Sequence, residues 1–157
     1  MTLGFYGTTG HAVNAWIDNI SNVSVTTGPV SGSYSAWATT NGAGTQTMDQ
    51  DHDNDGVPNG VEYFLGGSGN TTGFTALPGV VDTAGTLSVT WTKAASGYAG
   101  AYGTDYVVQT STTLATGDWT NEPSTGGGVT LSGNHVIYTF PSAGPLKFAR
   151  LKVMGAP

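Results

Sequence analysis

The second half of the chain alternates hydrophobic and polar residues in short runs that turn signals separate. Such alternation predicts half-buried strands, because successive side chains of a strand point to opposite faces. The repeating positions of the four clearest runs are Leu87, Val89 and Trp91; Tyr106, Val108 and Thr110; Val136, Tyr138 and Phe140; and Ala149, Leu151 and Val153. Further strand candidates lie at 76–82 and 127–132. About six to seven strands over residues 71–157 predict a mainly β protein built on a small antiparallel β-sandwich.

Residues 31–70 have a different pattern, with a short helical stretch on each side of an acidic loop. Ser33 is suited to cap a first helix, and Asn41-Gly42 is suited to end it. The apolar face of this helix consists of Tyr34, Trp37 and Ala38. The second helix has Val61, Phe64 and Leu65 on one face and ends at Gly66-Gly67. The pattern predicts a helix–loop–helix elbow that precedes the sandwich.

The first 30 residues alternate again. Val13, Ala15 and Ile17 occupy one set of positions, and Val23 and Val25 repeat the pattern after a gap, which predicts one or two strands. A segment of this length cannot bury an apolar face by itself. We therefore expect residues 1–30 to add a strand either to the C-terminal sheet or to a sheet in another molecule.

Composition narrows the class of protein. The chain has 157 residues, with 4 Lys+Arg against 10 Asp+Glu and a formal net charge of -6. This balance argues against nucleic-acid binding, which needs clustered cations to neutralise phosphates. The absence of Cys excludes a disulfide scaffold and a zinc–thiolate site. No apolar run approaches the roughly 18 residues of a membrane span, whereas 38% apolar residues suffice for a core.

The start of the chain bears on location. Met1-Thr2-Leu3-Gly4-Phe5 shows neither the basic start nor the long apolar stretch of a signal peptide. Few Lys and many Thr and Gly are, however, typical of secreted β-proteins. Either the sequence is a mature or excised segment, or the chain stays inside the cell. We expect an excised segment of a secreted protein, with an extracellular or cell-surface location.

The acidic stretch 49–62 contains the motif D-x-D-x-D-G-x5-E without a mismatch. Carboxylates at alternate positions of a tight loop converge on one point, and a glycine at the sixth position permits the sharp turn. Ca²⁺ takes six to eight such oxygen ligands. The predicted set is the side chains of Asp51, Asp53 and Asp55, the carbonyl of Val57, Asn59 directly or through water, and Glu62 as the bidentate ligand. Asp49 extends the alternation by one step and could serve a second ion or an outer shell.

The alternative is a solvated acidic turn that binds no ion, as most charge runs are. Here ligand type, glycine and glutamate all keep the register of a calcium loop, which favours binding. Two departures from a paired EF-hand matter: position eight of the loop is Pro58, and the first helix ends well before Asp51. Since the sequence has no second loop, we expect a lone structural brace rather than a sensor that opens a groove.

The residues around the loop resemble a known bacterial module. Residues 51–66, together with Trp37-Ala38 upstream, match the pattern D-x-D-x-D-G-x-x-N-x-x-E-Y-x-x-G. This module occurs near the C-termini of large secreted and surface proteins of environmental bacteria, and its loop is similar to dockerin and thrombospondin type 3 calcium repeats. The resemblance implies an extracellular, calcium-braced module without a defined enzymatic activity.

The resemblance extends over about residues 34–157. In that family a small β-domain follows the loop, with a strand similar to 106–114 that leads to a Trp, here Trp119. A last strand similar to 148–153 ends the domain. Residues 15–21 resemble the closing strand of a jelly-roll domain that usually precedes the module. The strand matches are individually less specific than the calcium loop.

No catalytic constellation stands out, and we expect no enzyme. A glycosidase pair would need Glu122 with an Asp outside the loop, and no spacing recommends one. The three His, at positions 11, 52 and 135, lie in no metal-binding or triad-like motif. Trp119, beside Gly117-Asp118, is the best candidate for stacking on a sugar ring.

These features lead to two hypotheses of function. The first is a calcium-binding extracellular structural protein that assembles with copies of itself, head to tail, through β-strand addition and calcium bracing. The alternative is a carbohydrate-binding or attachment module of a larger secreted enzyme or adhesin, which would bind extracellular polysaccharide through Trp119. A dockerin-like docking unit is a weaker third hypothesis, because a dockerin has two such loops.

Overall fold

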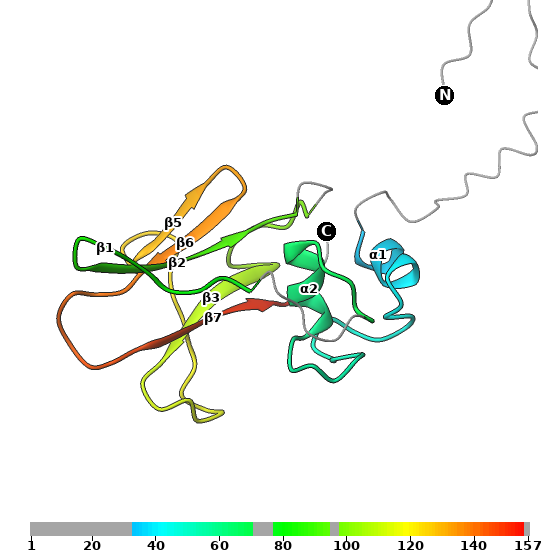
Figure 1. Cartoon of the computed structure of the whole chain (residues 1–157), viewed down its shortest axis with the longest axis horizontal. Coiled ribbons are helices and arrows are strands. Elements are labelled where there is room, and N and C mark those ends of the chain that lie inside the picture. The colour runs from blue at the N-terminus through cyan, green and yellow to red at the C-terminus, as the bar shows by residue number, and fades with distance from the viewer. Residues whose placement is uncertain (1–32, 71–76, 95–97, 156–157) are drawn as a thin grey trace, which may run out of the picture.

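A computed structural model describes residues 33–70, 77–94 and 98–155. The strand segment predicted over residues 1–30 lies outside these residues. In chain order, the elements are α1 (Tyr34–Thr40), α2 (Asn59–Leu65), β1 (Val81–Thr83), β2 (Thr86–Thr92), β3 (Tyr106–Ser111), β4 (Thr120–Asn121), β5 (Val129–Ser132), β6 (His135–Thr139) and β7 (Phe148–Val153). Both helices lie at one end of the strands (Figure 1).

The strands form two antiparallel sheets. One sheet has the order β1-β2-β6-β5, and the other has the order β4-β3-β7. All pairings between these strands are antiparallel, with Val89 opposite Tyr138 in the first sheet and Val108 opposite Leu151 in the second. The predicted mainly β fold with a small antiparallel sandwich is therefore confirmed.

The alternating residues fill the space between the sheets, as their period of two requires. The buried side chains of the first sheet are Val89, Trp91, Val129, Val136 and Tyr138, and those of the second are Tyr106, Val108, Leu151 and Val153. Burying a side chain of this size stabilises the fold by about 1.5–3 kcal/mol relative to leaving it in water.

Strand β3 differs from the half-exposed strand that its alternation predicts, because all six of its residues are buried. One face belongs to the core. On the other face the polar side chain of Gln109 is covered by its neighbours: its Nε2 donates to Asn121 at 2.8 Å, and its Oε1 accepts from Arg150 at 2.8 Å. Polar residues on β4 and β7 thus bury the face that the sequence pattern assigns to solvent.

The two predicted helices are confirmed at their expected positions. The hydroxyl of Ser33 accepts the main-chain N–H of Ala36 at the start of α1. Gly66 ends α2 with a φ of 80°, a left-handed conformation that glycine adopts without a steric penalty.

Aromatic side chains join the helices to the sandwich. The ring of Tyr63 on α2 lies 5.6 Å from Trp37 and 5.3 Å from Tyr98, measured between centroids. Phe64, on the same helix, lies 5.1 Å from Tyr106 of β3. The helix α2 and the two sheets therefore share one hydrophobic core. Among the described residues, no helix has the length and apolar character needed to cross a bilayer.

Candidate metal site

The acidic loop lies between the helices and is closed by main-chain hydrogen bonds at its base. The N–H of Asn59 donates to the carbonyl of Gln50, and the N–H of Gly60 donates to the carbonyl of Met48, both at 2.8 Å. These bonds satisfy donors at the first turn of α2, which has no side-chain cap. The loop is thereby attached directly to a buried helix.

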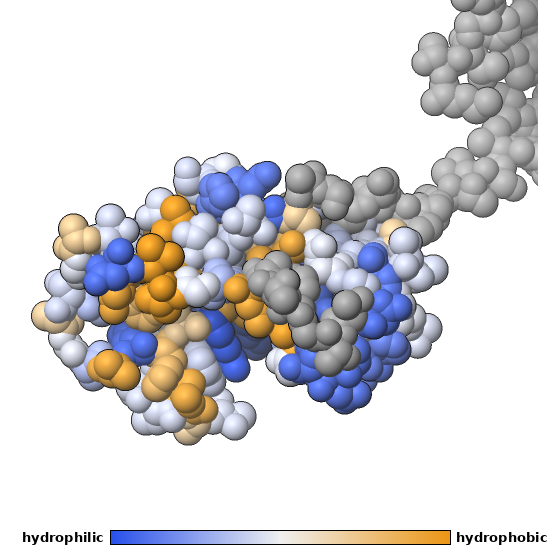
Figure 2. Space-filling view, viewed as in Figure 1, coloured by the Kyte–Doolittle hydropathy of each residue, from blue (hydrophilic) through white to orange (hydrophobic). Residues whose placement is uncertain are grey.

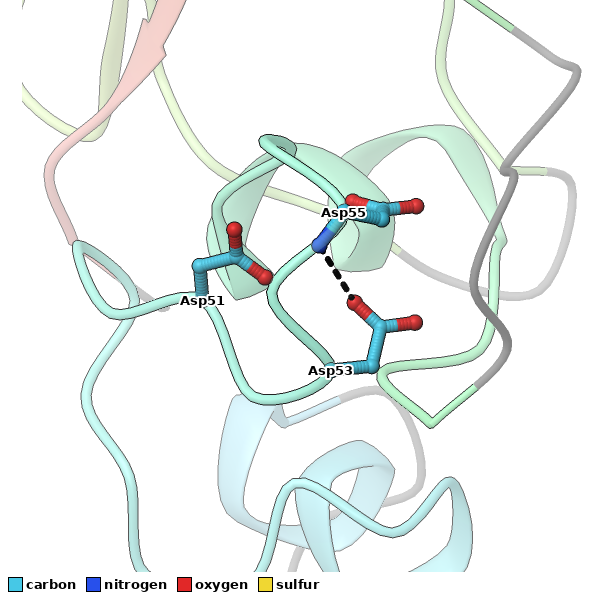
Figure 3. Close-up of side chains that lie close together, drawn as sticks. All are labelled: Asp51, Asp53 and Asp55. Carbon is cyan, nitrogen blue, oxygen red and sulfur yellow. Dashed lines mark hydrogen bonds between the residues drawn. The ribbon is translucent and has the colours of Figure 1, made fainter.

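The loop brings three of the predicted ligands together. Asp51, Asp53 and Asp55 each offer a carboxylate oxygen, and these oxygens lie within 4.8 Å of one another (Figure 3). Three carboxylates at this spacing repel each other by at least about 3.5 kcal/mol per pair at an effective dielectric constant of 20. A cation between them would remove this repulsion, so the group can hold a metal ion.

Main-chain donors fix the direction of the aspartate side chains. Asp51 accepts the N–H groups of Asn54 and Gly56 through its two oxygens, both at 2.8 Å. Asp55 accepts the N–H of Val57 at 2.8 Å. Gly56 has a φ of 93°, which only glycine adopts readily, so the glycine of the motif is required by the turn.

Glu62 is the most unusual residue of the site. Its side chain is fully buried on α2, and neither carboxylate oxygen has a hydrogen-bond partner among the described residues. Burial raises the pKa of Glu62 to about 7, and the negative charges of Asp53, Asp55 and Asp51 add to this shift. A buried carboxylate without a partner costs free energy that a bound cation would recover.

Asn59 has a different environment from the aspartates. Its side chain is fully buried, its Oδ1 accepts the main-chain N–H of His52 at 3.2 Å, and its Nδ2 donates to Gln46 Oε1 at 3.1 Å and to the Thr47 carbonyl at 3.2 Å. In the structure the side chain of Asn59 therefore connects the loop to the segment before it through hydrogen bonds.

The remaining predicted ligands occupy two different positions. The side chain of Val57 is buried in the core, and no described donor reaches its carbonyl oxygen, which leaves that oxygen available to an ion. Asp49 is exposed and lies outside the group of three aspartates. A hydrogen bond of 2.6 Å from the hydroxyl of Thr47 lowers the pKa of Asp49 below its ordinary value.

Sequence reasoning missed the residues that support the site. Gln46 and Thr47 position Asn59 from 12 to 13 residues away, a spacing that belongs to no motif. Asp53 Oδ2 and His52 Nδ1 are buried without a hydrogen-bond partner among the described residues. His52 Nδ1 is the one nitrogen of this pair, in a loop whose other candidate donor atoms are oxygens. The sequence pattern gave no sign that this nitrogen is buried.

Two carboxylates outside the loop, those of Asp118 and Glu122, have structural partners. Asp118 Oδ2 accepts the hydroxyl of Ser111 at 2.7 Å and the N–H of Thr112 at 2.9 Å, and these bonds lower the pKa of Asp118 well below its ordinary value. Glu122 accepts the hydroxyl of Thr110 at 2.7 Å and pairs with Lys147 at 3.4 Å.

Trp119, the predicted sugar-stacking residue, is partly buried. The guanidinium carbon of Arg150 lies 4.0 Å from the centroid of its ring. A cation at this distance occupies one face of the indole through a cation–π contact. A sugar ring could therefore stack only on the opposite face.

Comparison of the chain with models of protein families, with curated protein sequences and with solved structures gives no significant match.

Proposed function

We propose that this protein is a non-catalytic structural module whose acidic loop binds a calcium ion. The observation that supports the proposal most strongly is a fully buried Glu62 whose oxygens have no hydrogen-bond partner among the described residues, on the helix that follows three converging aspartates. The motif supplies Glu62 as the ligand that would reach back from the helix, and Glu62 lies in the first turn of α2, directly after the loop. A solvated acidic turn would have no need for a buried carboxylate.

Calcium fits the donors better than other common metals do. The proposed ligands are one oxygen each from Asp51, Asp53, Asp55 and Val57 and both oxygens of Glu62, with Asn59 contributing at most through water. Ca²⁺ accepts six to eight oxygens in flexible geometry. Mg²⁺ requires near-ideal octahedral geometry and keeps several of its waters. Zn²⁺ prefers thiolate and imidazole ligands, and the chain has no Cys.

Calcium in this loop would stabilise the whole fold. The loop is joined to α2 through Asn59 and Gly60, and α2 is part of the common core. Binding to the folded state alone adds about 2.7 kcal/mol of stability when the ion is at 100 times its Kd. Isolated calcium sites of extracellular modules bind at about 10⁻⁴–10⁻³ M, and such affinity is useful where calcium is abundant. This consideration supports the proposed extracellular location.

A thermal unfolding experiment tests the calcium proposal, and the two glutamates of the chain give a matched pair of variants. We expect calcium at 100 times its Kd to raise the melting temperature of the wild-type protein by about 5–10 °C above that in chelator. Glu62→Gln should abolish this rise, and Glu122→Gln should keep it because Glu122 lies outside the loop. An equal calcium response in the two variants would rule the proposal out.

We further propose that the module assembles with copies of itself outside the cell. Two features support assembly: the alternating sequence of residues 11–25 predicts a strand with an apolar face, and no described strand covers the edge of the second sheet at β7. The alternative of polysaccharide binding through Trp119 has less support, because Arg150 occupies one face of the indole.

A further inference from the structure

The second sheet has an open edge at β7. Among the strands that the structure describes, β3 alone pairs with β7, in the order β4-β3-β7. Alternate residues of an antiparallel strand direct their main-chain groups to opposite sides. The N–H of Met154 donates to Asp105 on the β3 side, so Ala149, Leu151 and Val153 direct their N–H and C=O groups away from β3. No described residue forms a hydrogen bond with these groups. Such an edge is a template for one more strand.

An apolar groove of about 720 Å³ runs along this open edge. Its lining includes Leu77, Val80, Trp91, Leu114, Phe148 and Leu151. Several of these side chains are exposed, among them Val80 at 58% and Leu114 at 52%. Figure 2 shows apolar side chains gathered on the sandwich in the region between β1 and β7. The combination of an unpaired edge and an apolar groove is the geometry that β-strand addition uses.

We propose that residues 13–17 of a second copy of this chain add to the open edge of β7 as an antiparallel strand. This inference rests on the proposed self-assembly and identifies the acceptor site. Val13, Ala15 and Ile17 have the two-residue spacing of Ala149, Leu151 and Val153. One antiparallel register keeps all three opposite those residues, with Val13 facing Val153, Ala15 facing Leu151 and Ile17 facing Ala149. In this register Ala15 faces the larger Leu151, and Ala149 faces the larger Ile17.

The outward-facing residues of the same register are also complementary. Trp16 stands opposite Arg150, whose guanidinium already stacks on Trp119 and can receive a second indole on its other side. The one charged side chain of segment 11–25 is Asp18, whereas three of the four Lys and Arg residues of the chain, Lys147, Arg150 and Lys152, line the groove. In this register Asp18 faces Phe148, next to Lys147, which also pairs with Glu122 at 3.4 Å. The groove lining has one acidic residue, Asp49.

The direction of β7 favours a second copy as the donor. Antiparallel pairing places Ile17 at the Phe148 end of β7, which lies away from α1, where the described chain begins at Ser33 (Figure 1). A segment of the same copy would have to reverse at Asp18 and return along about 17 Å of strand. A segment from a second copy leaves the groove directly. Repeated contacts of this kind join copies head to tail.

Complementing variants test the proposal in the full-length chain with excess calcium. Ala149→Pro removes an outward N–H of β7, and Ile17→Asp places a charge on the donor. We expect wild-type protein to form oligomers that grow with concentration in sedimentation velocity, and each variant to sediment as a monomer. An equimolar mixture of the two variants should form a dimer, because Ala149→Pro keeps the donor segment intact and Ile17→Asp keeps the acceptor edge of β7 intact. Leu131→Pro, the same change on the open edge of β5, should leave assembly intact.

A second variant and a cross-link keep this test independent of folding defects. Phe148→Asp changes the groove without removing a ladder hydrogen bond and should also abolish assembly. Since the chain has no Cys, Asn14→Cys with Lys152→Cys creates a single pair that this register places on opposing residues. Oxidation should then give a ladder of covalent oligomers. Asn14→Cys with Thr130→Cys is the control and should give none.

The outcomes separate this inference from the calcium proposal. If the wild-type protein binds calcium but remains a monomer at all concentrations, the strand-addition inference alone is overturned. This outcome includes the case in which residues 13–17 occupy the groove of their own copy. Oligomers that persist in both Ile17→Asp and Ala149→Pro would overturn it as well. Failure of the wild-type protein to bind calcium is a separate result that bears on the proposed metal site.

Discussion

The side-chain oxygen of Asn59, buried at the start of α2, accepts the main-chain N–H of His52 inside the acidic loop at 3.2 Å. The amide nitrogen of the same side chain donates to Gln46 and to Thr47. One side chain thus joins the loop, the helix and the segment before the loop, and this junction needs no metal.

Replacing Asn59 should therefore destabilise the protein with or without calcium. Asn59→Ala leaves the N–H of His52 and two acceptors without their partner, and each such loss costs about 1–3 kcal/mol when the group is buried. We expect the free energy of unfolding in urea to fall by a similar amount in chelator and in calcium. A loss seen only in calcium would show instead that Asn59 acts mainly as a ligand.

Gly60 should tolerate no side chain, because the loop, the helix and β7 meet there. A Cβ on Gly60 would lie 2.9 Å from Met48 Cβ and 3.2 Å from Val153 Cβ. Alanine usually stabilises a helix relative to glycine, but overpacking at this point should lower the free energy of unfolding by about 1–3 kcal/mol. The matched control is Gly117→Ala, where nothing lies within 4 Å. Equal unfolding midpoints for the two variants would contradict the packing described here.

The metal-free protein should lose stability as the pH rises from about 4.5 to 7. In this window Glu62 keeps its proton in the folded state, where its pKa is about 7, and loses it in the unfolded chain, where the ordinary value of 4.5 applies. Folding is therefore favoured at the acidic end, by up to about 3 kcal/mol for this group. Urea unfolding in chelator across this range measures the effect.

Glu62→Gln provides the control for this pH dependence, because glutamine has no proton to lose. Its stability should be nearly level over the same window. Calcium reverses the dependence in the wild-type protein, since the ion needs the ionised carboxylate and its binding releases a proton. Identical pH profiles for wild type and Glu62→Gln in chelator would contradict the assigned environment of Glu62.

The loop that follows β3 should depend on the ionised form of Asp118. Its carboxylate accepts hydrogen bonds from Ser111, Thr112 and Thr113, which lower its pKa. This contribution is fully present above the ordinary pKa of an aspartate and is lost as the pH falls below it. Asp118→Asn should therefore lower the unfolding midpoint at neutral pH and have little effect in strong acid. A constant difference at all pH values would contradict this role.

Local patterns in the sequence predicted most of the fold. Alternation predicts the face of β2 on which Val89 and Trp91 are buried, although Leu87 on the same face is 45% exposed. Ser33 marks the start of α1 through its side-chain hydroxyl, and Gly66 marks the end of α2 through its left-handed backbone. The alternation of β3 could not show that both of its faces are buried, because the covering residues Arg150 and Asn121 come from distant strands. The two-residue strand β4 is too short to leave a pattern.

The sequence likewise predicted only part of the candidate site. The motif predicted that Asp51, Asp53 and Asp55 converge, because their positions lie within one turn of chain. It could not show that Glu62 is fully buried without a partner, or that Asn59 bonds to Gln46, since both depend on how α2 packs. The open edge of β7 likewise follows from sheet order, which local sequence does not determine.

Calorimetric titration of calcium into chelator-treated protein at neutral pH tests the central claim most directly. The account predicts saturable binding of about one ion per chain, weakened more than about 100-fold by Glu62→Gln and unchanged by Glu122→Gln. The absence of saturable binding by the wild-type protein, or equal binding by both variants, would contradict it.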